Sequence, residues 1–170
     1  MANSYSNQVI SDSSKRTVIK LTGKLDANGE SANTKIIGKS LPGALAVDAN
    51  NLVLATAPGA VARSNYRYSI ARIIGDVFIP NGYVELLWDG ANSQTSIWIA
   101  SQSGDFNMMD NLGVITNTAN GSNGNVIVNT AGAGANNSYS LLIEIHKDPR
   151  DFNQGQVGST SNEFTQRITP

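Results

Sequence analysis

Apolar and polar side chains alternate in several short stretches of this chain, most clearly over Tyr139–His146. Side chains of a β-strand point alternately to opposite faces, so this spacing buries one face and exposes the other. The apolar positions of that stretch are Tyr139, Leu141, Ile143 and Ile145. Similar stretches recur along the chain, whereas helical spacing is nearly absent. The sequence therefore predicts an all-β protein.

Further strands are predicted wherever this pattern recurs between turn-forming residues. They are Lys15–Gly23, Thr34–Gly38, Ala44–Val47, Leu52–Ala55, Tyr66–Ile74, Val77–Ile79, Tyr83–Trp88, Thr95–Ala100 and Asn125–Asn129. For residues 41–63, which include Ala44–Val47 and Leu52–Ala55, a long loop is the alternative to paired short strands. One face of the fifth is expected to carry Tyr66, Tyr68, Ile70 and Ile74, interrupted by Arg72. About eight to ten strands without crossover helices favour an antiparallel β-sandwich, of which the jelly roll is one form.

One turn carries a strong pairing signal. Pro80-Asn81-Gly82 separates the apolar runs Val77–Ile79 and Tyr83–Trp88. An Asn-Gly dipeptide between two such runs is typical of a β-hairpin, because both residues tolerate a positive φ. We therefore expect these two strands to pair with each other.

The two ends of the chain lack this periodicity. We predict an N-terminal arm over residues 1–14, a β-sandwich domain over residues 15–148 and a C-terminal arm over residues 149–170. Residues 149–170 are polar and aperiodic, which is compatible with an arm on a neighbouring subunit or with a disordered tail. In the first case, deletion of residues 149–170 is expected to leave the domain folded.

Five large apolar side chains are candidate interface anchors, because such residues are frequent at binding hot spots. Trp98 alternates with Ile97 and Ile99, so it is expected to point outward from its strand. The other candidates interrupt the polar ends of the chain, and they are Val9, Ile10, Phe152 and Phe164.

The amino-acid composition restricts the kinds of partner that this chain can bind. Charged residues make up 15% of the 170 residues, against about 25% in an average soluble domain. Uncharged polar groups cost less to desolvate than charges, so such a surface suits close packing against neighbours. The net charge of −1 and a pI near 5.7 argue against nucleic acid as a partner. There is no cysteine and no apolar run of membrane-spanning length, and the first eight residues do not resemble a secretory signal.

The candidates for chemistry are few. His146 is the only histidine, and no Gly-x-Ser-x-Gly motif accompanies it. Two carboxylate pairs are close in sequence, Glu85 with Asp89 and Asp105 with Asp110. A glycosidase needs such a pair, but ordinary strand and turn positions explain these four. We expect no catalytic residue and no enzyme activity.

The sequence evidence for ligand-binding sites is equally weak. Asp26, Asn28 and Glu30 alternate around Gly29, but the further ligands of a calcium loop do not follow, so a turn is favoured. We expect no metal and no cofactor. Aromatic residues of the central strands could form a sugar platform only if several were exposed on one face. They are Tyr66, Tyr68, Tyr83, Trp88 and Trp98.

Three segments of the chain resemble proteins of a known class. Tyr5–Gly23, Ile73–Trp88 and Leu141–Phe152 resemble small virion structural proteins of tailed bacteriophages, notably those that infect cyanobacteria. The resemblance extends over much of the chain and includes no catalytic signature. It implies a non-enzymatic virion component, made in the host cytoplasm.

Within that resemblance, the first expectation is a head decoration (cement) protein that holds major capsid subunits together. A shell under internal DNA pressure gains from a clamp across its seams, and repeated sites add avidity. A homo-oligomer is expected, for which a trimer at a threefold position is one arrangement. The alternatives are a neck, tail or baseplate adaptor and, from another class, a carbohydrate-binding module on the particle.

Overall fold

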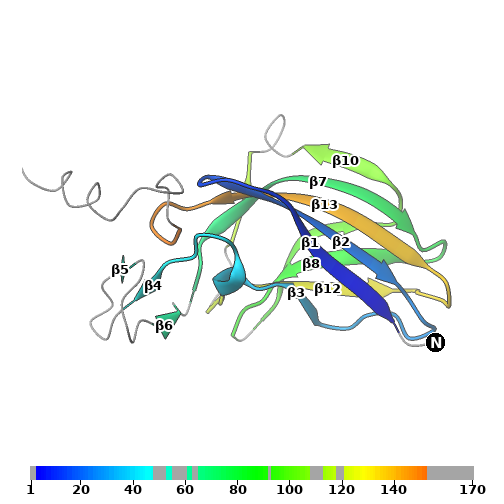
Figure 1. The fold of residues 1–170 in the computed structure, drawn as a ribbon. Helices are drawn as coiled ribbons and strands as arrows, with labels where there is room; N and C mark the ends of the chain where they lie inside the picture. Colours follow the sequence, from blue (N-terminus) through cyan, green and yellow to red (C-terminus); the bar gives the residue numbers. More distant parts are fainter. Residues whose placement is uncertain are drawn as a thin grey trace, which may run out of the picture.

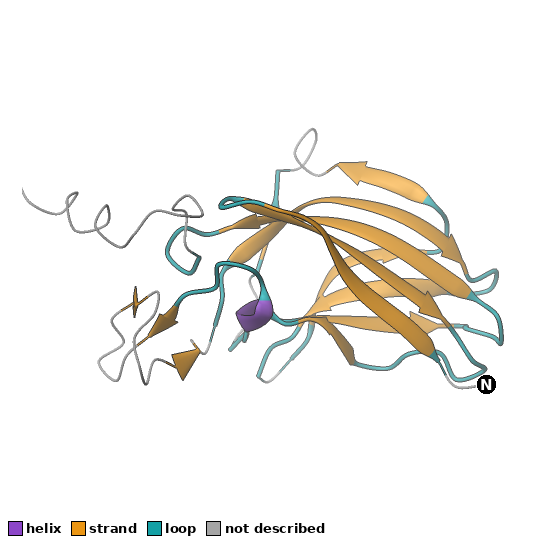
Figure 2. Ribbon diagram, in the orientation of Figure 1, coloured by secondary structure: helices purple, strands orange, loops and turns teal. Residues whose placement is uncertain are grey.

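The computed structural model describes residues 3–47, 53–54, 61–62, 65–91, 93–107, 113–117 and 121–152 (Figures 1 and 2). These residues form strands β1 to β13 and one short 3-10 helix, η1 (Gly38–Ser40), and the described part contains no α-helix. The strands form two larger sheets and one small sheet, and every pairing between them is antiparallel.

The first sheet, here called sheet A, has β1 at one edge and β10 at the other. Its strands in spatial order are β1 (Ser4–Asp12), β2 (Arg16–Lys24), β13 (Ser138–Lys147), β7 (Tyr68–Phe78) and β10 (Gly104–Asn107). A short strand, β11 (Ile115–Thr116), also pairs with β7. The first and last long strands of the chain are thus neighbours of β2.

The second sheet, sheet B, lies across the core from sheet A (Figure 1). Its order is β3 (Asn33–Ile36), β12 (Val126–Ala131), β8 (Tyr83–Trp88) and β9 (Thr95–Ala100). The small third sheet has the order β5 (Val53–Leu54), β4 (Ala46–Val47) and β6 (Val61–Ala62). The predicted short strands around residues 44–55 therefore exist and pair.

The hydrophobic core lies between sheets A and B. On β13, burial alternates as predicted, and Tyr139, Leu141, Ile143 and Ile145 are all buried. They pack in one cluster with Leu86 of β8 and with Val126 and Val128 of β12. Each sheet thus covers the apolar face of the other. The all-β fold class and the sandwich of two antiparallel sheets are confirmed, and the jelly-roll form stays a prediction.

The predicted hairpin at Pro80-Asn81-Gly82 is wrong. The turn exists, since the Gly82 amide donates to the Ile79 carbonyl at 3.1 Å. However, β7 belongs to sheet A, whereas β8 pairs with β12 and β9 in sheet B. The turn therefore carries the chain between layers. The residues of the turn determine only that the chain reverses direction. The sheet that each strand joins depends on where its apolar side chains can be buried.

The face predicted for Ile74 is also wrong. Arg72 pairs with Glu144 and Ile70 pairs with Ile145, so Ala71 is an extra residue on β7. Such a β-bulge shifts the alternation by one position. Ile70 and Ala71 are both buried, and Ile74 is 37% exposed. A bulge is invisible to a pattern search that assumes strict alternation.

Candidate functional site: an exposed edge strand

Strand β1 is the most exposed long element of the described chain. All nine of its residues, Ser4–Asp12, are exposed, although they pair with β2 along their length (Figure 1). The segment predicted as an N-terminal arm is therefore extended, as expected, but residues 4–12 form an edge strand of sheet A. The boundary drawn at residue 14 falls inside a hairpin of the domain itself.

Side chains fasten both ends of β1 to the body of the domain. At one end, the Asn3 side chain accepts a hydrogen bond from the Asp26 amide at 2.6 Å and donates one to the Gly29 carbonyl at 2.5 Å. At the other end, Asp12 accepts hydrogen bonds from Thr17 and from the Lys147 ammonium, each at 2.6 Å. These contacts hold β1 as a fixed edge.

A buried polar network supports the middle of β1. The Lys35 ammonium lies 3.4 Å from the centre of the Tyr5 ring and 3.0 Å from a Glu30 carboxylate oxygen. The other Glu30 oxygen accepts a hydrogen bond from the Tyr139 hydroxyl at 3.0 Å. Burial and the charge of Glu30 raise the pKa of Tyr139, so its hydroxyl stays protonated and donates. The side chain of Asn7 also donates to the Lys35 carbonyl.

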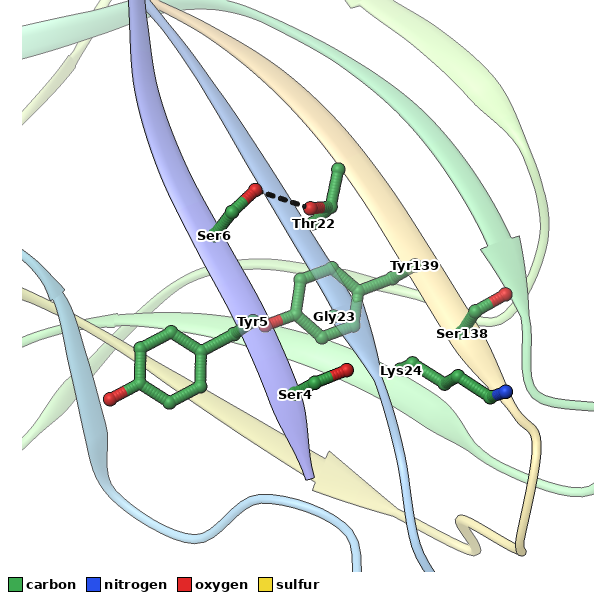
Figure 3. Close-up of a pocket in the computed structure, with 8 residues that line it drawn as sticks. All are labelled: Ser4, Tyr5, Ser6, Thr22, Gly23, Lys24, Ser138 and Tyr139. Atoms are coloured by element: carbon green, nitrogen blue, oxygen red, sulfur yellow. Dashed lines mark hydrogen bonds between the residues drawn. The ribbon is translucent and has the colours of Figure 1, made fainter. Parts of the chain in front are cut away.

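A shallow groove of about 350 Å³ runs beside β1 (Figure 3). Its floor includes Gly23, under which the Tyr139 ring lies. A Cβ at Gly23 would come within 2.4 Å of that ring, so the ring needs a glycine here. The polar lining comes from Ser4, Ser6, Thr22, Lys24 and Ser138, and the hydroxyls of Ser6 and Thr22 are 2.8 Å apart. These groups can donate and accept hydrogen bonds with a partner surface.

Two of the predicted interface anchors lie on this strand. Val9 is 46% exposed and Ile10 is 50% exposed. The pairing of β1 with β2 shifts between Val9 and Ser11, so Ile10 occupies a bulge. Both side chains are accessible to a partner, and their role at an interface stays a prediction.

Trp98 does not point outward. Leu86 pairs with Trp98 and Leu87 pairs with Ser96, so Ile97 is an extra residue in a bulge of β9. The bulge turns both Ile97 and Trp98 inward, and Ile99 is the exposed residue, at 55%. The Trp98 ring packs at 5.3 Å against Phe106. Trp98 is a core residue of the sandwich.

Phe152 also belongs to the core. It is fully buried, with ring centroids 5.7 Å from Tyr66 and 6.5 Å from Tyr68. It forms a bridge with Ala44, next to the hydrogen bond from the Leu45 amide to the Asp151 carbonyl. The folded domain therefore extends at least to Phe152 rather than to residue 148. Phe164 and the rest of the predicted C-terminal arm lie outside the described residues.

Two of the candidates for chemistry, His146 and Asp105, are held in side-chain pairs, and Asp110 lies outside the described residues. His146 lies 3.3 Å from Glu144, which also binds Arg16 at 3.2 Å on the outer face of sheet A. Asp105 pairs with Arg72, and this bond lowers the pKa of Asp105. Among the described residues, no group of three or more His, Cys, Asp or Glu could hold a metal ion. In the same residues, no helix is long and apolar enough to cross a membrane.

The aromatic residues proposed as a sugar platform are mostly internal. Tyr66, Tyr68, Trp88 and Trp98 are buried, and Tyr83 is 38% exposed. Tyr68 packs edge-on against Trp88 at 5.2 Å, and its hydroxyl donates to the Gly124 carbonyl. These five residues therefore do not form an exposed stacking surface.

The network of Glu30, Lys35 and Tyr139 was not predicted from the sequence. Glu30 follows a turn and Lys35 lies in a short strand, which are positions where charged residues are usually solvated. No local signal marks them, because their burial depends on β1 and β13, which are distant in the chain.

Comparison with known proteins identifies no relative. No protein-family model, curated protein or solved structure matches this chain significantly.

Proposed function

We propose that this chain is a structural protein of a phage virion, namely a head decoration protein that stabilises contacts between major capsid subunits. The main support for the proposal is β1, a nine-residue edge strand that is exposed throughout and fastened at both ends to the sandwich. An open strand edge offers backbone hydrogen bonds to another protein. Most soluble domains protect such an edge with charges or prolines. Here the only charge on the strand is Asp12 at its end.

The composition of the rest of the surface supports the same proposal. Several large apolar side chains on different elements are exposed, including Phe78 at 63% and Ile99 at 55%. The groove beside β1 offers the hydroxyl groups of Ser4, Ser6, Thr22 and Ser138, with Lys24 as its one charged lining residue. Such a surface is desolvated at low cost when it meets a neighbour. The partners proposed are the major capsid protein or other virion proteins, together with further copies of the chain, and the location is the virion.

The test is the copy number and attachment of the protein in purified particles of the phage that encodes it. A decoration protein is expected at on the order of hundreds of copies per particle, because it follows the repeated sites of the shell. It is also expected to bind emptied heads and to raise their melting temperature. A few dozen copies or fewer, with no effect on emptied heads, would favour the neck, tail or baseplate adaptor instead. Absence from the particle would refute a virion role altogether.

A further inference from the structure

We propose that two copies of this chain join edge to edge through β1, so that their two A sheets form one continuous antiparallel sheet around a twofold axis at Asn7. In the part of the chain that the structure describes, β1 pairs with β2 alone, so its other edge has no strand partner. The hydrogen bonds and ion pairs at its two ends hold the strand ready for such pairing.

Among the described outer strands of sheets A and B, namely β1, β10, β3 and β9, β1 is also the least protected. The opposite edge of sheet A, β10, has four residues, one of which is Asp105 in an ion pair with Arg72. In sheet B, β3 has four residues, and the Asn7 side chain already binds its Lys35 carbonyl. The other edge of sheet B, β9, contains the bulge at Ile97. Charge, short length and bulges all discourage pairing of edges, and β1 has none of them between Ser4 and Val9.

A second copy is the partner that the sequence of β1 fits best. A twofold axis at Asn7 sets Tyr5 of one copy opposite Val9 of the other, and Ser6 opposite Gln8. Tyr5, Asn7 and Val9 share one face, since they pair with Gly23, Leu21 and Ile19 of β2. Tyr5 is 57% exposed and Val9 is 46% exposed, so each Tyr5–Val9 contact would cover two accessible apolar groups. Aromatic and β-branched residues are favourable opposite neighbours in antiparallel strands.

Charge and length agree with this register. The segment from Tyr5 to Val9 pairs entirely with itself around Asn7, and it contains no charged residue. It ends at the Ile10 bulge, so Asp12 lies beyond the paired region. Pairing in this register therefore sets no like charges opposite each other within the paired segment. A strand of this length buries less area than a standard interface, so dimerisation is expected to depend strongly on concentration.

The inference deepens the proposed function and rests on it for its biological role, since a dimer would give a decoration protein two attachment points. A dimer also differs from the trimer considered from the sequence. The test uses the purified full chain without any particle, so its failure would leave the virion role standing. Conversely, failure of the virion role would leave the measured pairing standing.

Cysteine cross-linking tests the register, because the natural chain contains no cysteine. Residues directly opposite each other in antiparallel strands are close enough for a disulfide. Asn7→Cys is expected to form a disulfide-linked dimer under mild oxidation roughly tenfold faster than Ile99→Cys, an exposed residue on another edge strand, as effective concentration implies. Gln8→Cys is a second control, since its opposite neighbour is Ser6.

A mixture of two variants removes any dependence on the Asn7 side chain. Tyr5→Cys mixed with Val9→Cys is expected to give a mixed disulfide dimer in preference to either homodimer. Sedimentation of the natural chain is expected to show a concentration-dependent dimer that Val9→Lys weakens and Ile99→Lys does not. The proposal is overturned if Asn7→Cys cross-links no faster than both controls, if Gln8→Cys is the faster one, or if the natural chain stays monomeric or forms a trimer.

Discussion

Two truncations that differ by only two residues should differ greatly in stability. One ends at Arg150 and the other ends at Phe152, so their comparison isolates Asp151 and Phe152. Phe152 is fully buried among aromatic rings. The Asp151 carboxylate is also fully buried, and it accepts hydrogen bonds from the Arg67 guanidinium at 2.7 and 2.9 Å and from the Arg67 backbone amide at 2.7 Å.

The magnitude follows from these contacts. Loss of a buried Phe side chain costs about 3–5 kcal/mol. Loss of the hydrogen bonds to a charged group adds about 1 kcal/mol here, below the roughly 1.5–3 kcal/mol usual for charged groups, because the Arg67 side chain is 39% exposed and is screened by water. The sum of about 4–6 kcal/mol is a large share of the roughly 5–15 kcal/mol that stabilises a typical domain. At about 2–4 °C per kcal/mol, the melting temperature should fall by roughly 8–24 °C.

Thermal and urea unfolding followed by circular dichroism provide the measurement. The point variant Phe152→Ala in the full chain should account for most of the difference between the truncations, and Phe152→Leu for much less. Equal melting temperatures for the two truncations would refute the assignment of Phe152 to the core. That result would also restore the expectation that residues 149–170 are dispensable for folding.

Three further predictions concern the network under β1 and the buried tyrosines. Gly23→Ala should lower the free energy of unfolding, measured in urea, by about 1–3 kcal/mol, because the new methyl group meets the Tyr139 ring. An unchanged free energy of unfolding would contradict that contact. Glu30→Gln should cost about 3–5 kcal/mol, since it leaves the Lys35 charge buried without its partner, and the double variant with Lys35→Met should recover part of the loss. Burial raises the pKa of both Tyr68 and Tyr139, so these hydroxyls bind their protons more tightly in the folded state. Stability is therefore expected to fall as the pH rises above about 10, and absorbance titration of tyrosinate should show their ionisation only together with unfolding.

Much of the sheet structure is readable from the sequence where strict alternation holds. The buried faces of β2 and β13 were predicted residue by residue. In both strands every second side chain is buried, and no bulge interrupts the pairing of the two strands. Prediction failed where one extra residue entered a strand, at Ala71 and at Ile97. A single bulge reverses every side chain that follows, so Ile74 and Trp98 were assigned to the wrong faces.

At the candidate site too, some features were predicted from the sequence and others were not. Val9 and Ile10 were predicted as interface anchors, and the structure exposes both of them. The pairing of residues 4–12 with β2 was not, because an exposed edge strand needs no apolar face and so has no periodic signature. Phe152 presented the opposite problem, since a single aromatic residue in a polar segment can be buried or exposed with equal local plausibility.

By itself, the sequence determined that this chain is all-β, that its core strands alternate and that its surface carries few charges, because these properties depend on the residues of each segment alone. Only the tertiary structure decided that Pro80-Asn81-Gly82 joins two sheets, that Phe152 is part of the core and that β1 is an edge strand among the described residues. Those features depend on contacts between segments far apart in the chain, and the free energy of such contacts does not appear in any local pattern.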